Sequence, residues 1–116
     1  MARRRTEEDI QAAVVVHLKI RGARGLVFFH VPNAPRNAVM GARLKAMGMR
    51  SGVADLVLFH NEKLYCLELK APGKRATEEQ LQFLTDMGEA GAFTCVCDNL
   101  DAALRVLSAW GLIVGK

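Results

Sequence analysis

The stretch GVADLVLFHNEKLYCLELK, residues 52–70, decides the fold. Two apolar runs flank the polar segment 60–63, a pattern typical of two strands joined by a hairpin turn. Acidic residues interrupt this pattern, because Asp55 lies at the start of the first run and Glu68 lies near the end of the second. The strands of a hairpin are antiparallel, so the start of one lies beside the end of the other. We therefore expect Asp55 to lie close to Glu68 and Lys70.

Helical and strand patterns surround this hairpin on both sides. Thr6 before three acidic residues is typical of a helix N-terminus, and Gln80 three residues after Thr77 is a capping-box pattern. We expect a first helix that ends at Gly22, and then, in order, a strand over 26–31, a helix over 38–47, the two hairpin strands, a helix over 77–89, a strand over 92–97 and a helix over 100–110. The order αβαββαβα predicts the α/β class, with a mixed β-sheet flanked by helices.

The composition is that of one small globular domain spanning residues 1–116, with a basic arm over residues 1–5. Its apolar runs are far shorter than the ~18 residues of a membrane span, and we expect neither a membrane segment nor a secretion signal. An odd count of three cysteines favours reduced thiols and a cytoplasmic location. The net charge of +4 indicates a polyanionic partner such as nucleic acid, or equally an ordinary solvated surface.

The charged residues of the hairpin have a chemistry of their own. Alternate side chains of a strand share a face, so Glu68 and Lys70 project together. Two neighbouring carboxylates repel each other unless a cation lies between them or one binds a proton. Oxygen ligands of this kind suit Mg²⁺ or Mn²⁺, and Lys70 would then orient an attacking water or stabilise charge on a phosphate. The alternative is a simple ion pair of Lys70 with Glu68 or Asp55 at an exposed edge.

The segments around this cluster carry a family resemblance. GVADL followed by LELK resembles the PD-(D/E)xK nucleases, with Ala54 where that motif often has proline. Together with TEEDIQAAVVVHL, FFHVPNAPRN, LKAMGMRSGVADL and TEEQLQFL, these segments are similar to the virus-type replication-repair nuclease (VRR-NUC) domain, over about residues 6–97. The chain resembles the stand-alone versions of this domain in phages and prophages. The resemblance implies a restriction-endonuclease-like fold.

The resemblance also implies a set of catalytic residues: Glu7, Asp55, Glu68, Lys70 and Gln80. Glu7, Asp55 and Glu68 would hold one or two Mg²⁺ or Mn²⁺ ions, with the backbone carbonyl of Leu69 as a further ligand. Lys70 would position the hydrolytic water and Gln80 would support it. Two points stay open: Glu8 is the rival of Glu7, and Gln80 could equally be only the capping partner of Thr77.

Several polar residues are candidates for DNA contacts. They are Arg3, Arg4, Arg5, His30, Asn33, Arg36, Arg43, Lys45, Arg50 and Lys74. His30 and Asn33 would contact phosphate or nucleotide beside the site, or they would only stabilise a turn. Cys66, Cys95 and Cys97 do not have zinc-ribbon spacing and are expected to be small buried residues.

These expectations together describe a metal-dependent DNA endonuclease. With no evident base-reading element, recognition of DNA shape is favoured over recognition of sequence. The resemblance further implies a homodimer that acts in DNA repair on branched DNA such as four-way (Holliday) junctions, in the cytosol of a bacterium or a phage-infected host. The alternatives are a DNA-binding module without cleavage and a sequence-specific restriction-type nuclease.

Overall fold

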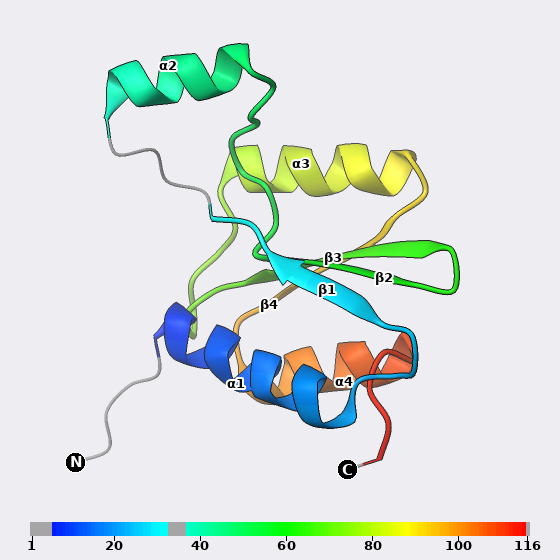
Figure 1. The fold of residues 1–116 in the computed structure, drawn as a ribbon. Coiled ribbons are helices and arrows are strands. Elements are labelled where there is room, and N and C mark those ends of the chain that lie inside the picture. The colour runs from blue at the N-terminus through cyan, green and yellow to red at the C-terminus, as the bar shows by residue number, and fades with distance from the viewer. Residues whose placement is uncertain (1–5, 33–36, 116) are drawn as a thin grey trace, which may run out of the picture.

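A computed structural model describes residues 6–32 and 37–115 of the chain. These residues form eight helices and strands in the predicted order αβαββαβα (Figure 1). The elements are α1 (Glu7–Arg21), β1 (Val27–His30), α2 (Ala38–Ala46), β2 (Leu56–His60), β3 (Lys63–Leu69), α3 (Glu78–Glu89), β4 (Phe93–Cys97) and α4 (Leu100–Ala109). The predicted fold class is confirmed. Among the described residues, no helix combines the length and apolar character that a bilayer span requires.

The described strands form one mixed sheet in the order β1-β2-β3-β4. β1 pairs with β2 and β2 with β3 in antiparallel fashion, whereas β3 and β4 are parallel. The turn of the β2–β3 hairpin places Asn61 and Glu62 at φ values of 50° and 65°. Two consecutive left-handed residues match the twist of the flanking strands, which explains the tight reversal that the sequence predicted. Helix α3 makes the crossover that two parallel strands require.

Helices cover the sheet on both faces. α1 and α4 lie on one face and α3 lies on the other (Figure 1). The larger core joins α1 and α4 to the inward side chains of β2 and β3, including Leu58 and Leu67. Trp110, just after α4, belongs to this core, and its ring lies 5.1 Å from that of Tyr65. The smaller core packs Phe83 and Leu84 of α3 against the opposite face of the sheet.

Two helices begin with capping boxes. The sequence indicated the box at Thr77, and at Thr6 it indicated an N-cap. The Thr6 side chain accepts from the Asp9 N–H while Asp9 accepts from the Thr6 N–H, at the start of α1. Thr77 and Gln80 make the same reciprocal pair at the start of α3. Each pair satisfies backbone donors that a helix N-terminus leaves free. The first turns of α1 and α3 are therefore fixed, and both turns bear on the site described below.

Helix α2 differs from the others because it stands apart from the sheet (Figure 1). None of its residues is buried, and Val39 is 76% exposed. Asn37 caps its N-terminus by accepting from the Met40 N–H. A helix of nine residues gains little from local interactions alone, and most helical stability in proteins comes from packing. The described part of the chain does not supply that packing for α2.

Candidate active site

Asp55 and Glu68 lie side by side, as the hairpin predicted. The register pairs Leu56 with Leu67, which places Asp55 opposite Glu68 at the next position. The Asp55 N–H donates to Glu68 Oε1 at 3.2 Å, and the Leu69 N–H donates to Asp55 Oδ2 at 2.8 Å. Each carboxylate is thus held by a backbone donor of the neighbouring strand. The two side chains have a fixed separation and orientation.

The loop before Asp55 is held against helix α3. Gly52 has a φ of +77°, and a Cβ built on it would lie 2.7 Å from the carbonyl carbon and oxygen of Glu79. This position therefore needs glycine for two independent reasons: its left-handed backbone and the close approach of α3. Ala54 is fully buried in the smaller core. A small residue there lets the chain pass between α3 and the sheet before it reaches Asp55.

Strand β1 holds the other side of Asp55. The Asp55 carbonyl oxygen accepts from the Val31 N–H at 3.2 Å and from His30 Nδ1 at 2.7 Å. Because a carbonyl oxygen only accepts, Nδ1 of His30 carries the hydrogen. His30 was predicted as a DNA contact. The structure gives it a second task, which is to fix the backbone that presents Asp55.

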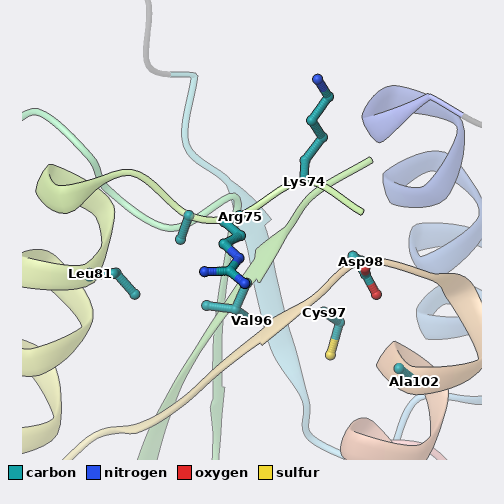
Figure 2. Close-up of a pocket in the computed structure, with 8 residues that line it drawn as sticks. Lys74, Arg75, Leu81, Val96, Cys97, Asp98 and Ala102 are labelled. Carbon is teal, nitrogen blue, oxygen red and sulfur yellow. The ribbon is translucent and has the colours of Figure 1, made fainter. Parts of the chain in front are cut away.

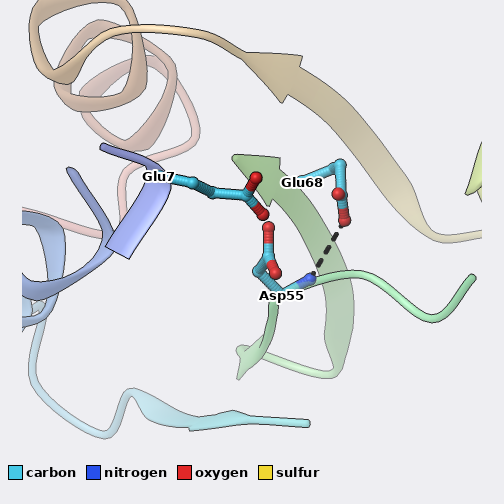
Figure 3. A group of neighbouring side chains, drawn as sticks. All are labelled: Glu7, Asp55 and Glu68. Carbon is cyan, nitrogen blue, oxygen red and sulfur yellow. Dashed lines mark hydrogen bonds between the residues drawn. The ribbon is translucent and has the colours of Figure 1, made fainter. Parts of the chain in front are cut away.

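Glu7 completes the acidic group from the first turn of α1. One carboxylate oxygen from each of Glu7, Asp55 and Glu68 lies within 4.8 Å of the other two (Figure 3). Glu7 Oε2 also lies 3.9 Å from Lys70 Nζ. Glu8 lines the adjacent groove but does not belong to this group. The geometry therefore places Glu7, rather than Glu8, with the two hairpin carboxylates.

Lys70 and Gln80 adjoin the acidic group. Lys70 Nζ donates to Gln80 Oε1 at 3.2 Å and lies 4.0 Å from Glu68 Oε2. Gln80 Oε1 also accepts from the Thr77 N–H at 2.8 Å. The two interpretations left open for Gln80 are thus compatible, because one oxygen caps α3 and holds the Lys70 ammonium. The structure brings all five predicted catalytic residues together.

Burial gives this cluster unusual electrostatics. Glu68 is 1% exposed, and this burial, together with the nearby Asp55 carboxylate, raises its pKa from 4.5 to about 8, although Lys70 acts in the opposite direction. Burial also raises the pKa of Asp55, against the hydrogen bond from the Leu69 N–H. For Glu7, burial and then the charge of Asp55 raise the pKa. Three carboxylates share a site where their mutual repulsion is poorly screened.

This site fits a divalent cation. Glu68 Oε2 is buried and accepts no hydrogen bond from the residues that the structure describes. A buried acceptor without a partner is costly, and a metal ion in contact with it would remove that cost. Three carboxylates are the hard oxygen donors that Mg²⁺ and Mn²⁺ prefer. The Leu69 carbonyl, predicted as a further ligand, belongs to the residue whose N–H holds Asp55.

An open groove of about 800 Å³ leads to the acidic group along α1. Glu7, Asp55 and His30 lie at one end of it, and Lys19 contributes a cation farther along the helix. Lys19 was not among the predicted contacts. Its spacing would have indicated it, because it follows Gln11 and Val15 at helical intervals on one face. The residues that line the groove are Glu7, Glu8, Gln11, Ala12, Val15, Val16, Lys19, His30 and Asp55.

The predicted DNA contacts fall into several groups. Arg3, Arg4, Arg5, Asn33 and Arg36 lie outside the described residues.

Arg43 and Lys45 lie on the isolated helix α2, and Lys74 lies beside a second cavity between α3 and α4. Arg50 forms an ion pair with Asp86, and its guanidinium lies 5.3 Å from the Phe83 ring centroid. These contacts attach the loop before Gly52 to α3.

Asp55, Glu68 and Lys70 lie at one end of the central strands β2 and β3, and Glu7 joins them from α1. The chain is thus an α/β domain with a candidate metal centre. Comparison with solved structures finds a protein with a similar fold. A protein described as a VRR_NUC domain protein superimposes on 91% of this chain and 88% of its own, with a TM-score of 0.75 and 22% sequence identity. No protein-family model and no curated protein matches the chain. At this level of identity the likeness establishes the fold, which is the one that the sequence segments indicated.

Proposed function

We propose that this chain is a Mg²⁺- or Mn²⁺-dependent DNA endonuclease. One observation carries the proposal: Glu7, Asp55, Glu68 and Lys70 converge from three separate segments on one buried, partly unsatisfied cluster. A domain that only bound DNA would have no use for a carboxylate that is costly to ionise. The similarity of the fold to that of a VRR_NUC domain protein supports the same class of activity.

We assign different roles to the residues of the cluster. Glu7, Asp55 and Glu68 would hold the metal, which when bound supplies charge neutralisation at the phosphate and lowers the pKa of a water. The Lys70 ammonium is held between Gln80 Oε1 and the acidic group, so that it can orient the attacking water and stabilise negative charge on the phosphate. Gln80 keeps the ammonium in place. His30 and Val31 hold the Asp55 backbone in the orientation that its side chain requires.

The basic surface indicates how DNA would reach this cluster. Lys19 and His30 lie in the groove that ends at Glu7 and Asp55, and α2 carries Arg43 and Lys45. These cations would hold phosphates of the bound DNA. Binding through phosphates falls steeply with salt and depends on DNA shape more than on base sequence.

The finer expectations belong to the same proposal. We propose branched DNA, such as a four-way junction, as the preferred substrate, and a homodimer as the active form. Two catalytic sites related by a two-fold axis suit paired incisions. The exposed apolar residues Val39, on α2, and Met47, just after it, would be covered in such an assembly. The proposed location is the cytosol, where cysteines stay reduced.

A cleavage assay tests the proposal directly. Linear, nicked, flapped and four-way DNA are incubated with the protein in Mg²⁺, Mn²⁺ or EDTA. The test variants are Asp55→Asn and Lys70→Ala, and the controls are Asp101→Asn on α4 and Lys63→Ala at the far end of the hairpin. We expect a loss of at least about 10²-fold in cleavage for both test variants. The controls should cut like the wild type.

Two outcomes would contradict the proposal. One is a folded wild-type protein that cuts none of these substrates in either metal, and this result would favour the binding module without cleavage if DNA binding persists. The other is cleavage by Asp55→Asn and Lys70→Ala at the wild-type rate, which would place the chemistry elsewhere. A fixed cut within one short base sequence would instead indicate a restriction-type nuclease.

A further inference from the structure

A second cavity lies where the chain leaves the parallel strands in opposite directions. After β3 the chain passes to α3 on one face of the sheet, and after β4 it passes to α4 on the other face (Figure 1). In open α/β sheets, ligands bind in the crevice outside the carboxyl ends of strands at such a switch point. The cavity at this point measures about 420 Å³. That volume lies in the range of roughly 300–1,000 Å³ that small-molecule sites have.

The cavity has an apolar floor and a charged rim (Figure 2). Leu81, Val96 and Ala102 form the apolar part, and Leu81 is 49% exposed although it is a large hydrophobic residue. The Arg75 side chain points toward Val96, whereas Lys74 points away from the cavity (Figure 2). An apolar surface next to a guanidinium suits a ligand with a flat apolar face and a negative charge.

Asp98 adds a hydrogen-bond acceptor to the rim. Its Oδ2 accepts from the Gly73 N–H at 3.0 Å, and its Oδ1 accepts from Asn99 Nδ2 at 3.1 Å. These bonds fix the carboxylate and lower its pKa, so that it is ionised. Each carboxylate oxygen has a second lone pair, and a ligand amino group can use it. The exocyclic amino groups of cytosine, adenine and guanine are donors of this kind.

The cavity adjoins the catalytic cluster directly. Val96 is the register partner of Glu68 on the neighbouring strand, and adjacent strands lie about 4.8 Å apart. The Lys70 N–H donates to the Cys97 carbonyl at 2.9 Å, and Leu81 follows Gln80 in α3. A nucleotide next to the phosphate at the cluster would therefore reach the cavity without any movement of the strands.

We propose that this cavity binds the base of an unpaired nucleotide that flanks the scissile phosphate. The base lies on the floor of Leu81, Val96 and Ala102, its amino group faces Asp98, and Arg75 binds the adjoining phosphate. This inference rests on the proposed nuclease function and extends it. A paired, stacked base cannot enter the cavity, so the enzyme selects DNA that has, or easily yields, an unpaired nucleotide at the cut.

Two variants test the cavity without touching the catalytic cluster. Ala102→Leu fills the floor, and Ala109→Leu makes the same change at an exposed position of the same helix. Arg75→Ala removes the rim cation, and Arg24→Ala removes an exposed cation in the loop between α1 and β1. Each variant is first checked for folding by circular dichroism and thermal melting. Arg75→Ala keeps the test decisive if Ala102→Leu does not fold.

The first measurement does not depend on cleavage. Fluorescence anisotropy in EDTA gives the Kd for a labelled single-stranded oligonucleotide and for a blunt duplex. We expect Ala102→Leu and Arg75→Ala to weaken single-strand binding about tenfold, the size of one base contact, and to leave duplex binding nearly unchanged. The two controls should match the wild type. Equal effects on both DNAs, or no effect on either, would overturn the proposal.

The second measurement locates the unpaired base. 2-Aminopurine is placed on each side of the mapped cut, and its fluorescence is followed as DNA binds to the Lys70→Ala protein. We expect a rise at one flanking position that Ala102→Leu abolishes and Ala109→Leu preserves. A rise that survives Ala102→Leu, or no rise at either position, would contradict the proposal. If the wild type cuts no DNA, the nuclease function fails, while the anisotropy measurement still decides whether the cavity binds a base.

Discussion

The buried carboxyl of Glu68 predicts that the metal-free protein loses stability as the pH rises. Its pKa is about 8 in the folded chain, against an ordinary value of 4.5 that applies when the chain unfolds. Between these values the folded state keeps a proton that the unfolded state releases. The stabilising contribution is therefore fully present below pH 4.5 and is lost as the pH rises toward 8. Asp55 and Glu7 act in the same direction, because their pKa values are also raised.

The size of the effect follows from the difference between the two pKa values. One proton corresponds to about 1.36 kcal/mol per pH unit, so the free energy of unfolding should fall by about 3 kcal/mol between pH 5.5 and 7.5. The whole interval from 4.5 to about 8 corresponds to about 5 kcal/mol. A small domain has a total stability of about 5–15 kcal/mol. The metal-free protein should therefore be much weaker at pH 8 than at pH 5.5.

Urea denaturation in EDTA measures this change. Glu68→Gln removes the ionisable group but keeps an oxygen that can accept from the Asp55 N–H, and it should flatten most of the slope. Glu89→Gln, at the exposed end of α3, is the matched control and should keep the wild-type slope. If the wild-type stability is constant or rises over this interval, or if Glu68→Gln retains the full slope, Glu68 does not hold a proton in the folded protein.

Three further results are expected from the same geometry. Gly52→Ala should lower the free energy of unfolding by more than the roughly 1–2 kcal/mol of a left-handed residue, and should abolish cleavage, because the new Cβ would meet the Glu79 carbonyl. Urea melts should show a smaller loss for Gly73→Ala, where φ is +78° but a new Cβ would meet no atom within 4 Å. Gln80→Ala should lower kcat about tenfold to a hundredfold, because Lys70 loses the hydrogen bond to Gln80 and a hydrogen bond to a charged group is worth about that much. Gln82→Ala, on the same helix, should keep the wild-type kcat. Mn²⁺ should raise the Tm strongly at pH 8 and weakly at pH 5.5, because at the lower pH it must displace the Glu68 proton. An equal rise in Tm at both pH values would contradict the link between metal binding and the Glu68 proton.

Local sequence signals were sufficient for most of the fold. The hairpin followed from two apolar runs around residues 60–63, and the capping residues Thr6 and Thr77 fixed the starts of α1 and α3. These signals act over a few residues, where sequence reasoning is strongest. The juxtaposition of Asp55 and Glu68 was also within reach, because a short turn leaves an antiparallel pair few registers. The placement of Glu7 relied instead on the resemblance to a family.

Other features depend on contacts between distant segments and gave no local signal. Gly52 has no local sequence signal for its role, because it lies against the backbone of α3 more than twenty-five residues later in the chain. The sequence predicts Arg50 as a DNA contact, and its ion pair with Asp86 depends on the packing of α3, which lies far away in the sequence. The cavity beside Val96 depends on which faces of the sheet α3 and α4 cover. The order of the elements alone does not determine which face of the sheet each of these helices covers.

The two capping boxes have a role beyond the helices that they begin. α1 brings Glu7 to the acidic group from its first turn, and α3 brings Gln80 to Lys70 from its first turn. Each helix thus directs its N-terminal end, which carries partial positive charge, toward a site crowded with carboxylates. That charge does not offset burial, since the pKa of Glu68 is still raised to about 8. The remaining imbalance is what a divalent cation would neutralise. The same packing that should make the metal-free site unstable at high pH would therefore give the site the affinity for metal that we propose.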